Sequence, residues 1–407
     1  MRKAILLIAM SAAASLAAAQ DQGNIVVPDS SIEKTGDAGV RMHTNYFMHV
    51  PDPNLTPDSP PPGVTVETPG SIGCIYDLVS PHVVGCPVAT ATAVPKGGSD
   101  LIVIVDAFDY PNPGVDLSKF NAKWGLPGTT LVKRYANGHK PPNACASGWE
   151  GEESLDIQWA HAMAPKATIV LMEAASNSLY DLTFAVHAAN VYIKNHGGKG
   201  EVSMSWGSSE FSTETTGDPL FTEANVVYLA SSGDVGGVSW PSASPNVVST
   251  GATQIKRNSA GNYAGQVGSK NCGATAGVGC GGGQSIYEAR PIYQDGVSSV
   301  VGHVRGTPDI ASDSSMDSPV WVYNSSCYNS WIQVWGTSVA SPTLAGVINN
   351  AGSFKASSKA ELLEIYNNRH VTADYTDIKS GSCVNHAAHT GFDLCTGVGV
   401  VKGFVKK

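Results

Sequence analysis

A helix followed by a buried strand is indicated by residues 151–172, which read GEESLDIQWAHAMAPKATIVLM. Leu155 and Trp159 recur at helical spacing, and Gly151 and Pro165 bound that pattern. The run that follows the proline is continuously apolar, as expected for a strand covered on both faces. This order of elements is typical of α/β proteins.

The same alternation extends outward in both directions along the chain. Apolar runs that predict buried strands are Leu101–Val105, Ala167–Met172, Val202–Met204, Val226–Ala230 and Asn246–Thr250, and helices are predicted at Glu153–Met163 and Tyr180–Asn195. We therefore predict one α/β domain with a mostly parallel sheet and helices on both faces. In such sheets the site lies beyond the carboxyl ends of the strands, where Asp106 and the segment 231–234 follow predicted strands.

The amino-terminal end has the layout of a secretory signal. Arg2 and Lys3 precede an apolar run, and an alanine-rich end at residues 17–19 predicts cleavage before Gln20. We expect an exported protein, extracellular or periplasmic. The net charge of −9 argues against nucleic acid or an anionic membrane as a partner. No later apolar run is long enough to span a bilayer.

Composition divides the rest of the chain in two. Residues 20–70 are rich in Pro, Asp, Thr and Ser and predict a mostly irregular arm, and residues 71–407 have the composition of one globular domain. A glycine-rich segment at 273–283 lacks a phosphate-loop signature and is interpreted as a flexible or substrate-framing loop.

The eight cysteines are an even number in an exported chain, so disulfides are expected. Proximity suggests three pairs and leaves two cysteines over, with the connectivity open; the pairs are Cys74 with Cys86, Cys272 with Cys280 and Cys383 with Cys395, and the remainder are Cys145 and Cys327.

Two carboxylates in the predicted helix are four residues apart. Glu152 and Asp156 would share one helix face beside the apolar row. Near a core, two such carboxyl groups either stay solvated or share a proton. A shared proton would indicate a chemical role for the pair. The alternative is that acidic residues of a first helical turn simply favour the helix dipole.

A candidate nucleophile lies near the carboxyl end of the chain. Ser338 precedes a small, apolar run suited to a buried helix, and a helix start suits a serine whose product carries an oxyanion. Capping of that helix is the alternative role. No histidine motif supplies a base, since Gly138-His139-Lys140 precedes two prolines, and the elbow G-x-S-x-G is absent. The nearest sensible base is a carboxylate.

Four ordered motifs together resemble the sedolisin family of serine-carboxyl peptidases, over about residues 71–403. They are Gly151-Glu152-x-x-x-Asp156, Ser205-Trp206-Gly207, Ser232-Gly233-Asp234 and Gly336-Thr-Ser338-x-x-x-Pro342, with supporting matches at Trp240-Pro-Ser-Ala-Ser-Pro, Gly281-Gly-Gly-Gln-Ser, Pro308-Asp-Ile-Ala and Gly391-Phe-Asp393.

The resemblance implies a subtilisin-like fold and a role for each matched residue. It makes Ser338 the nucleophile, Glu152 the general base and Asp156 the carboxylate that holds and tunes Glu152. It makes Asp234 the acid of the oxyanion site. Two further matches extend the proton network, with Asp106 as an additional acid and Trp206 as a lining side chain.

The resemblance also implies one structural calcium ion, bound by oxygen ligands from a loop near the carboxyl end. The matching positions are Asp377, Ile378, His389, Gly391 and Asp393. His389 stands where a glycine is usual, so backbone ligation there requires a φ that is open to other residues. A plain surface turn pinned by Cys383 and Cys395 is the alternative.

The leading functional hypothesis is a secreted, acid-acting endopeptidase that cleaves polypeptide substrates as a monomer. The alternatives are a tripeptidyl exopeptidase on the same fold and a non-catalytic secreted binding protein. Most members of the family carry a large folded propeptide, whereas about 50 residues stand here between signal and domain. The mode of activation is therefore open.

Overall fold

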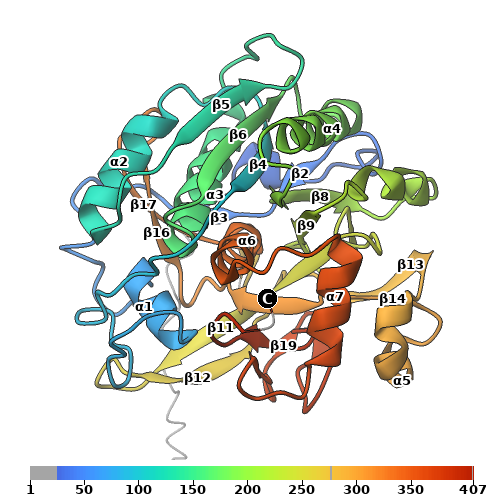
Figure 1. Cartoon of the computed structure of the whole chain (residues 1–407). Coiled ribbons are helices and arrows are strands. Elements are labelled where there is room, and N and C mark those ends of the chain that lie inside the picture. The colour runs from blue at the N-terminus through green and yellow to red at the C-terminus, as the bar shows by residue number, and fades with distance from the viewer. Residues whose placement is uncertain (1–24, 276, 406) are drawn as a thin grey trace, which may run out of the picture.

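The computed structural model describes residues 25–275, 277–405 and 407 (Figure 1). The signal predicted for residues 1–19 lies outside these residues. In the part of the chain that is described, no helix combines the length and the apolar character that a membrane crossing requires.

A ten-stranded, mostly parallel sheet forms the centre of the molecule. Its strands follow the order β18 (Tyr375–Thr376), β21 (Val400–Val401), β15 (Ile310–Asp313), β11 (Val248–Arg257), β9 (Val226–Ser231), β7 (Gly200–Met204), β4 (Leu101–Ala107), β6 (Thr168–Ala174) and β5 (Leu131–Tyr135), and β12 (Tyr263–Gly268) pairs with β11 off this path. Two pairings are antiparallel, β18 with β21 and β11 with β12, and the others are parallel.

The predicted α/β fold is confirmed, and the five predicted strands correspond to β4, β6, β7, β9 and β11. The two predicted helices correspond to α3 (Trp149–Met163) and α4 (Leu179–Asn195). One boundary differs: Asp106, expected directly beyond its strand, lies inside β4. The pairing of β4 with β6 continues through Ala107 because the strand stays covered there.

The two faces of β4 show how the layers are built. Ile102 and Ile104 belong to the core on the side of α3 and of α6 (Ala340–Ala351), whereas Val103 and Val105 belong to the core on the side of α4. Successive side chains of a strand point to opposite faces. Asp106 therefore faces α3, because it continues the alternation of Ile102 and Ile104.

The other elements surround this sheet (Figure 1). The remaining α-helices are α1 (Pro69–Ile75), α2 (Pro113–Trp124), α5 (Ser298–Val301) and α7 (Ser358–Asn367), and the 3-10 helices are η2 (Asp29–Ser31), η3 (Cys145–Ser147), η4 (Glu214–Phe221) and η5 (Ile292–Val297). Small two-stranded sheets are formed by β13 (Gly283–Ala289) with β14 (Val304–Thr307) and by β19 (Ser382–Cys383) with β20 (His386–Ala387).

The predicted arm is short of regular structure but packs deeply into the domain. In one sheet, β1 (Ile25–Val26) and β3 (Phe47–His49) join β17 (Ser330–Trp335) and β16 (Val320–Asn324), and in another β2 (His43–Thr44) joins β8 (Trp206–Ser209) and β10 (Ser239–Trp240). Met42, Tyr46 and Met48 are completely buried. The arm thus threads through the domain, a placement that its composition does not reveal.

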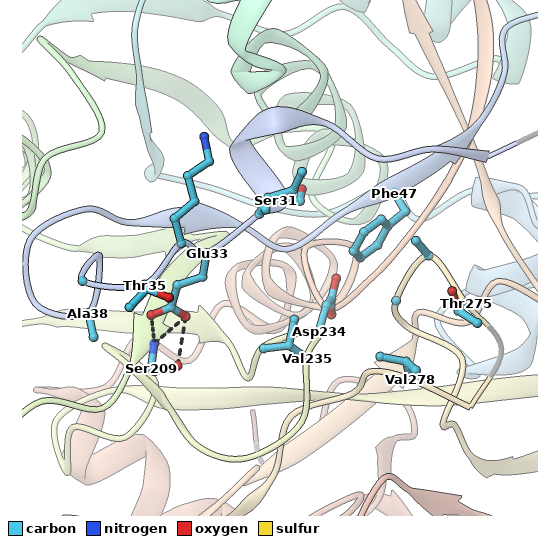
Figure 2. Close-up of a pocket in the computed structure, with 15 residues that line it drawn as sticks. Ser31, Glu33, Thr35, Ala38, Phe47, Ser209, Asp234, Val235, Thr275 and Val278 are labelled. Atoms are coloured by element: carbon cyan, nitrogen blue, oxygen red, sulfur yellow. Dashed lines mark hydrogen bonds between the residues drawn. The ribbon is translucent and has the colours of Figure 1, made fainter.

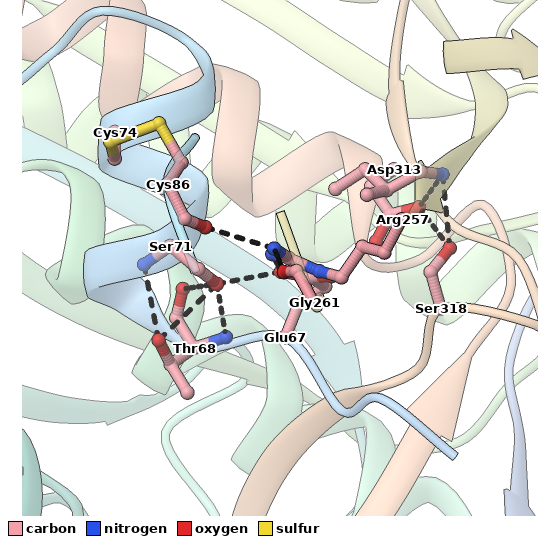
Figure 3. Close-up of polar contacts among 10 residues, drawn as sticks. Glu67, Thr68, Ser71, Cys74, Cys86, Arg257, Gly261, Asp313 and Ser318 are labelled. Carbon is pink, nitrogen blue, oxygen red and sulfur yellow. Dashed lines mark hydrogen bonds and ion pairs between the residues drawn. A yellow bond between two sulfur atoms is a disulfide. The ribbon is translucent and has the colours of Figure 1, made fainter. Parts of the chain in front are cut away.

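A polar cluster fixes the end of the arm where α1 begins (Figure 3). The Arg257 guanidinium donates to both carboxylate oxygens of Glu67, at 2.7 and 2.5 Å. Glu67 also accepts from the Ser71 hydroxyl, while Thr68 caps the helix by accepting from the Ser71 backbone N–H. The bidentate geometry makes this charged pair strong and well oriented.

Four disulfides close the fold. The three pairs that proximity suggests are present, and the two remaining cysteines, Cys145 and Cys327, form the fourth. This last bond spans 182 residues of sequence and joins the segment before α3 to the hairpin of β16 and β17. It therefore links the segment that leads into α3, which carries the candidate base, to the hairpin that precedes the candidate nucleophile.

Candidate active site

The turn between β17 and α6 presents Ser338 to the first turn of α3. Gly336 has φ +115, and a Cβ built there would lie 2.3 Å from both Asn45 O and Asp234 Oδ2, so only glycine fits. The Ser338 hydroxyl lies 2.9 Å from Glu152 Oε2, to which it donates, and 3.1 Å from Ser205 O. A serine hydroxyl held on a carboxylate is the arrangement that nucleophile activation requires.

Glu152 and Asp156 lie on one face of α3, as their spacing predicts, and both are completely buried. The Ser205 hydroxyl donates to Asp156 Oδ1 at 2.8 Å. Burial raises the pKa of both carboxyls well above the ordinary range, and repulsion from Asp156 raises that of Glu152 further. The Ser205 hydroxyl, and then the neighbouring Glu152 carboxyl, counteract part of the rise in the pKa of Asp156. The pair therefore shares a proton and titrates as a unit.

Asp106 continues this row of acids on the same side of the sheet. It is fully buried, and neither of its carboxyl oxygens has a hydrogen-bond partner among the described residues. Burial, and then repulsion from Asp156 and Glu173, raise its pKa well above the usual value. Glu173, whose own pKa is raised by burial to about 7, contacts Lys133 Nζ at 3.1 Å. The buried acids thus extend from Ser338 to a cation at the edge of the fold.

Trp206 lies beside this row rather than in it. Its indole N–H donates to Val105 O at 2.7 Å, and its ring packs in the core on the side of α4. The indole has one donor, and that donor is used by the backbone. Trp206 therefore supports the end of β4 next to Asp106 without a hydrogen bond to any carboxyl.

The two oxygens of Asp234 have different surroundings. Oδ1 accepts from the backbone N–H and the hydroxyl of Thr337, at 2.8 and 2.9 Å. Oδ2 is buried and has no partner in the described chain. Burial raises the pKa of this carboxyl to about 8, with the Thr337 contacts opposing the rise. Because Oδ1 already accepts two hydrogen bonds, the acid proton belongs on Oδ2, which lies against Gly336 together with Asn45 O, the acceptor of the Ser338 backbone N–H.

A cavity of about 590 Å³ opens beside Asp234. Figure 2 shows Asp234 facing it together with Ser31 and Phe47 of the arm and Thr275 and Val278 of the glycine-rich loop. That loop lies between Cys272 and Cys280, which are bonded to each other. The predicted loop at 273–283 therefore frames one wall of a cleft that leads to the candidate site.

The predicted calcium positions come from two segments that are in contact, residues 377–378 and residues 389–393. Asp393 Oδ2 accepts from His389 N and Asp377 Oδ2 accepts from Gly391 N, each at 3.0 Å. Gly391 has φ +84, whereas His389 does not adopt a positive φ, so no glycine is required at that position. Both carboxylates thus face the 389–391 turn, and an oxygen that accepts one N–H keeps a lone pair for a cation. Calcium prefers oxygen ligands, and the two carboxylates and the carbonyl of Ile378 are ligands of this kind.

The site also contains residues that sequence reasoning did not single out. Ser205, within a quoted motif, holds Asp156, and Thr337 orients Asp234. Asn45 of the arm contacts Ser338 from a distance of 293 residues. Neighbouring motifs could have indicated the first two, but no pattern in the sequence points to Asn45.

Known proteins match this chain over most of its length. No family model matches it. Sedolisin from Pseudomonas sp. (strain 101) is 27% identical over 76% of this chain and 57% of that protein, and kumamolisin from Bacillus sp. (strain MN-32) is 26% identical over 70% and 55%. The chain thus spans a little more than half the length of these relatives.

Solved structures share the fold. Pseudomonas sedolisin, described as a serine-carboxyl proteinase complexed with two molecules of pseudo-iodotyrostatin, superposes with a TM-score of 0.67 at 24% identity, covering 83% of this chain and 96% of that one. Sphericase gives 0.52 at 19% identity, covering 83% and 99%. With the relatives above, these findings confirm the predicted family and its subtilisin-like architecture. The chain is a homologue of the sedolisin family of serine-carboxyl peptidases.

Proposed function

We propose that the protein is a secreted serine-carboxyl endopeptidase that hydrolyses peptide bonds at acidic pH through an acyl-enzyme. The observation that carries the proposal is the 2.9 Å hydrogen bond from the Ser338 hydroxyl to Glu152, in a site that is closed to bulk water and backed by Asp156. Kinship with serine-carboxyl peptidases supports it.

The reaction follows from the positions of the groups. Ser338 Oγ attacks the peptide carbonyl while Glu152 accepts its proton, and Glu152 then returns that proton to the leaving amine. Water repeats the cycle on the resulting ester. Asp156, which accepts from the Ser205 hydroxyl, shares a proton with Glu152, so one proton of the carboxyl pair must leave before Glu152 can act as base.

The negative oxygen that forms during attack requires donors. The Ser338 backbone N–H and a protonated Asp234 Oδ2 lie on the side where that oxygen would develop, and donors placed in advance contribute strongly to catalysis. This arrangement works only while Asp234 keeps its proton. Activity at acidic pH is the expected consequence.

A structural calcium ion is part of the proposal. Asp377, Ile378, His389, Gly391 and Asp393 would hold it, and it would supply a fixed positive charge that pins the 377–393 segment. No step of hydrolysis depends on it. Its contribution is to stability, because it binds only the folded loop.

The proposal is tested with the full chain and the variant Ser338→Ala. We expect the wild type to digest an unfolded protein at acidic pH, and the variant to be inactive because no other nucleophile is placed beside Glu152. Mass spectrometry of the products measures both outcomes and separates internal cleavage from release of tripeptides. Circular dichroism is the control for folding, and full activity of the variant would remove Ser338 from the mechanism. A folded wild type that cleaves nothing would favour the binding-protein alternative.

A further inference from the structure

The arm lies directly on the candidate nucleophile. The Ser338 backbone N–H donates to Asn45 O at 3.0 Å, and the Asn45 N–H donates to Ser338 Oγ at 3.1 Å. Ser338 is completely buried. The residue that would attack a substrate is therefore covered by a segment of its own chain.

The approach to Asn45 has the register of an added strand. In β2, His43 pairs with Gly207 and Thr44 pairs with Trp206, antiparallel to β8. The same register places Asn45 opposite Ser205, whose carbonyl lies 3.1 Å from the Ser338 hydroxyl. Extended peptides are commonly bound by addition to such an edge, with backbone bonds that do not depend on side chains. The arm thus occupies the place of an extended peptide that leads to Ser338.

The carbonyl of Asn45 lies where a reacting carbonyl belongs. The backbone N–H of a nucleophilic serine is one of the donors that bind the developing oxyanion. Asn45 O accepts that N–H, and it lies against the same point of Gly336 as Asp234 Oδ2, which has no hydrogen-bond partner among the described residues. The Ser338 N–H therefore binds this carbonyl, and a proton on Asp234 Oδ2 would be a second donor beside it.

The side chain of Asn45 is recognised as well. Its amide Nδ2 donates to the Ser231 hydroxyl at 2.7 Å, and both residues are buried. Ser231 ends β9, so its position is fixed by the central sheet. A hydroxyl can both donate and accept, so it pairs well with a side-chain amide. Opposite an apolar side chain, the buried hydroxyl would be left without a partner.

From this geometry we propose that residues 43–46 are a tethered substrate of the site, in which Asn45 supplies the attacked carbonyl and Ser231 selects its side-chain amide. The proposal rests on the peptidase function and adds to it a bond, Asn45–Tyr46, and a substrate class, peptides with asparagine before the cleaved bond.

The chemical step balances within the chain. Ser338 Oγ bonds to the carbonyl carbon of Asn45, the bond from that carbon to Tyr46 N breaks, and the proton accepted by Glu152 passes to Tyr46 N. Water then releases Asn45 as a free carboxylate. Tyr46 stays in place after cleavage, because its hydroxyl donates to Gly148 O at 2.5 Å and β3 follows it.

The segment before Asn45 also has its own attachments. Both carboxylate oxygens of Glu33 accept from the Ser209 backbone N–H, at 3.1 and 3.0 Å (Figure 2). Arg41 forms an antiparallel bridge with Ser178, so the bound segment continues past His43 and does not end three residues before the bond. This continuity favours an endopeptidase over a tripeptidyl exopeptidase. It also keeps the site covered until the cleaved arm leaves.

The bond is tested by incubating the full chain at acidic pH and following fragments by intact mass. We expect a fragment that begins at Tyr46 from the wild type and none from Ser338→Ala, at a rate independent of protein concentration because the substrate is tethered. Asn45→Leu should slow its appearance about tenfold or more. Asn54→Leu, at an exposed arm position, is the matched control and should behave as wild type.

Selection of the amide is tested separately with short peptides, so the result does not depend on folding of an arm variant. For two peptides that differ only in Asn or Leu before the cleaved bond, we expect kcat/KM to favour Asn about tenfold or more. Ser231→Ala should reduce that ratio, since the hydroxyl is lost.

Two results distinguish the failures. If the wild type digests added polypeptide while the Asn45–Tyr46 bond stays intact and Asn is not preferred over Leu, the tethered-substrate proposal is wrong and the peptidase function stands. If the folded wild type and the Asn45→Leu variant cleave neither the arm nor any peptide, the peptidase function itself fails.

Discussion

The two carboxyl oxygens of Asp234 have different roles. Thr337 saturates Oδ1 with two donors, which leaves Oδ2 as the oxygen that carries the proton. The neutral carboxyl can then act as a hydrogen-bond donor through Oδ2. Its usefulness depends on remaining neutral, which burial favours by raising its pKa to about 8.

The pH profile of activity follows from this residue and from the carboxyl pair. Activity should rise as the Glu152–Asp156 pair loses one proton and fall as Asp234 ionises, with the upper limb no higher than about pH 8 and the centre below neutrality. Measurement of kcat/KM against pH checks this expectation. An optimum on the alkaline side of neutrality would contradict it.

Two substitutions distinguish the contribution of the ionisable Asp234 proton from the contribution of a hydrogen-bond donor at that position. Asp234→Asn keeps a donor at the position of Oδ2 that does not ionise, so its activity should persist further into the alkaline range than that of the wild type. Asp234→Ala removes the donor and should lower kcat by on the order of 10²–10³ at all pH values. A wild-type kcat in the alanine variant would show that the reaction does not need this acid.

The turn of residues 389–391 illustrates how a short element depends on its surroundings. Asp393 and Asp377 each accept one backbone N–H from it, and the disulfide between Cys383 and Cys395 closes it. These contacts orient two carboxylates toward one turn. They also explain why His389 is tolerated there, since its backbone does not enter the left-handed region.

Calcium should stabilise this element and, through it, the protein. We expect added calcium to raise the Tm of the chelated wild type. When calcium exceeds its Kd one hundredfold, the free energy of unfolding should increase by about 2.7 kcal/mol. Asp393→Asn should lose that response, whereas Asp29→Asn, at an exposed site, should keep it. Calorimetry with and without calcium measures the difference. An identical Tm under both conditions, with no calcium found by elemental analysis, would remove the ion from the account.

Across the described residues, several buried acids have raised pKa values. Burial raises the pKa of Glu214 and Glu288 to about 8 and that of Glu173 and Glu361 to about 7. In the unfolded chain such groups ionise near pH 4. The folded state therefore binds more protons than the unfolded state between roughly pH 4 and 8, so folding stability falls as pH rises through this range.

We expect the Tm of the protein to be higher at pH 5 than at pH 8. The Ser338→Ala variant is the suitable sample, because self-digestion would otherwise distort the measurement. Glu361→Gln removes one of these buried acids from α7 and should flatten the dependence of Tm on pH. A Tm that rises steadily from pH 5 to pH 8 would show that groups with lowered pKa values dominate instead.

Much of the fold could be predicted from local patterns. Five strands and two helices can be predicted because each is a run of residues long enough to show its own apolar period. The alternation of Ile102 and Ile104 also determines which face of the sheet Asp106 takes. The spacing of Glu152 and Asp156 likewise places them on one face of α3. Local periodicity carries this information because helices and strands repeat every few residues.

What the sequence determined by itself, then, is which acids and which serine are presented by sheet and helix. The tertiary structure alone decided that Ser205 holds Asp156, that Thr337 leaves one oxygen of Asp234 free to donate, and that Asn45 lies on Ser338. The arm has no apolar period of its own. Its path is set by strand pairing and side-chain contacts with residues hundreds of positions away, and such contacts leave no mark in the local sequence.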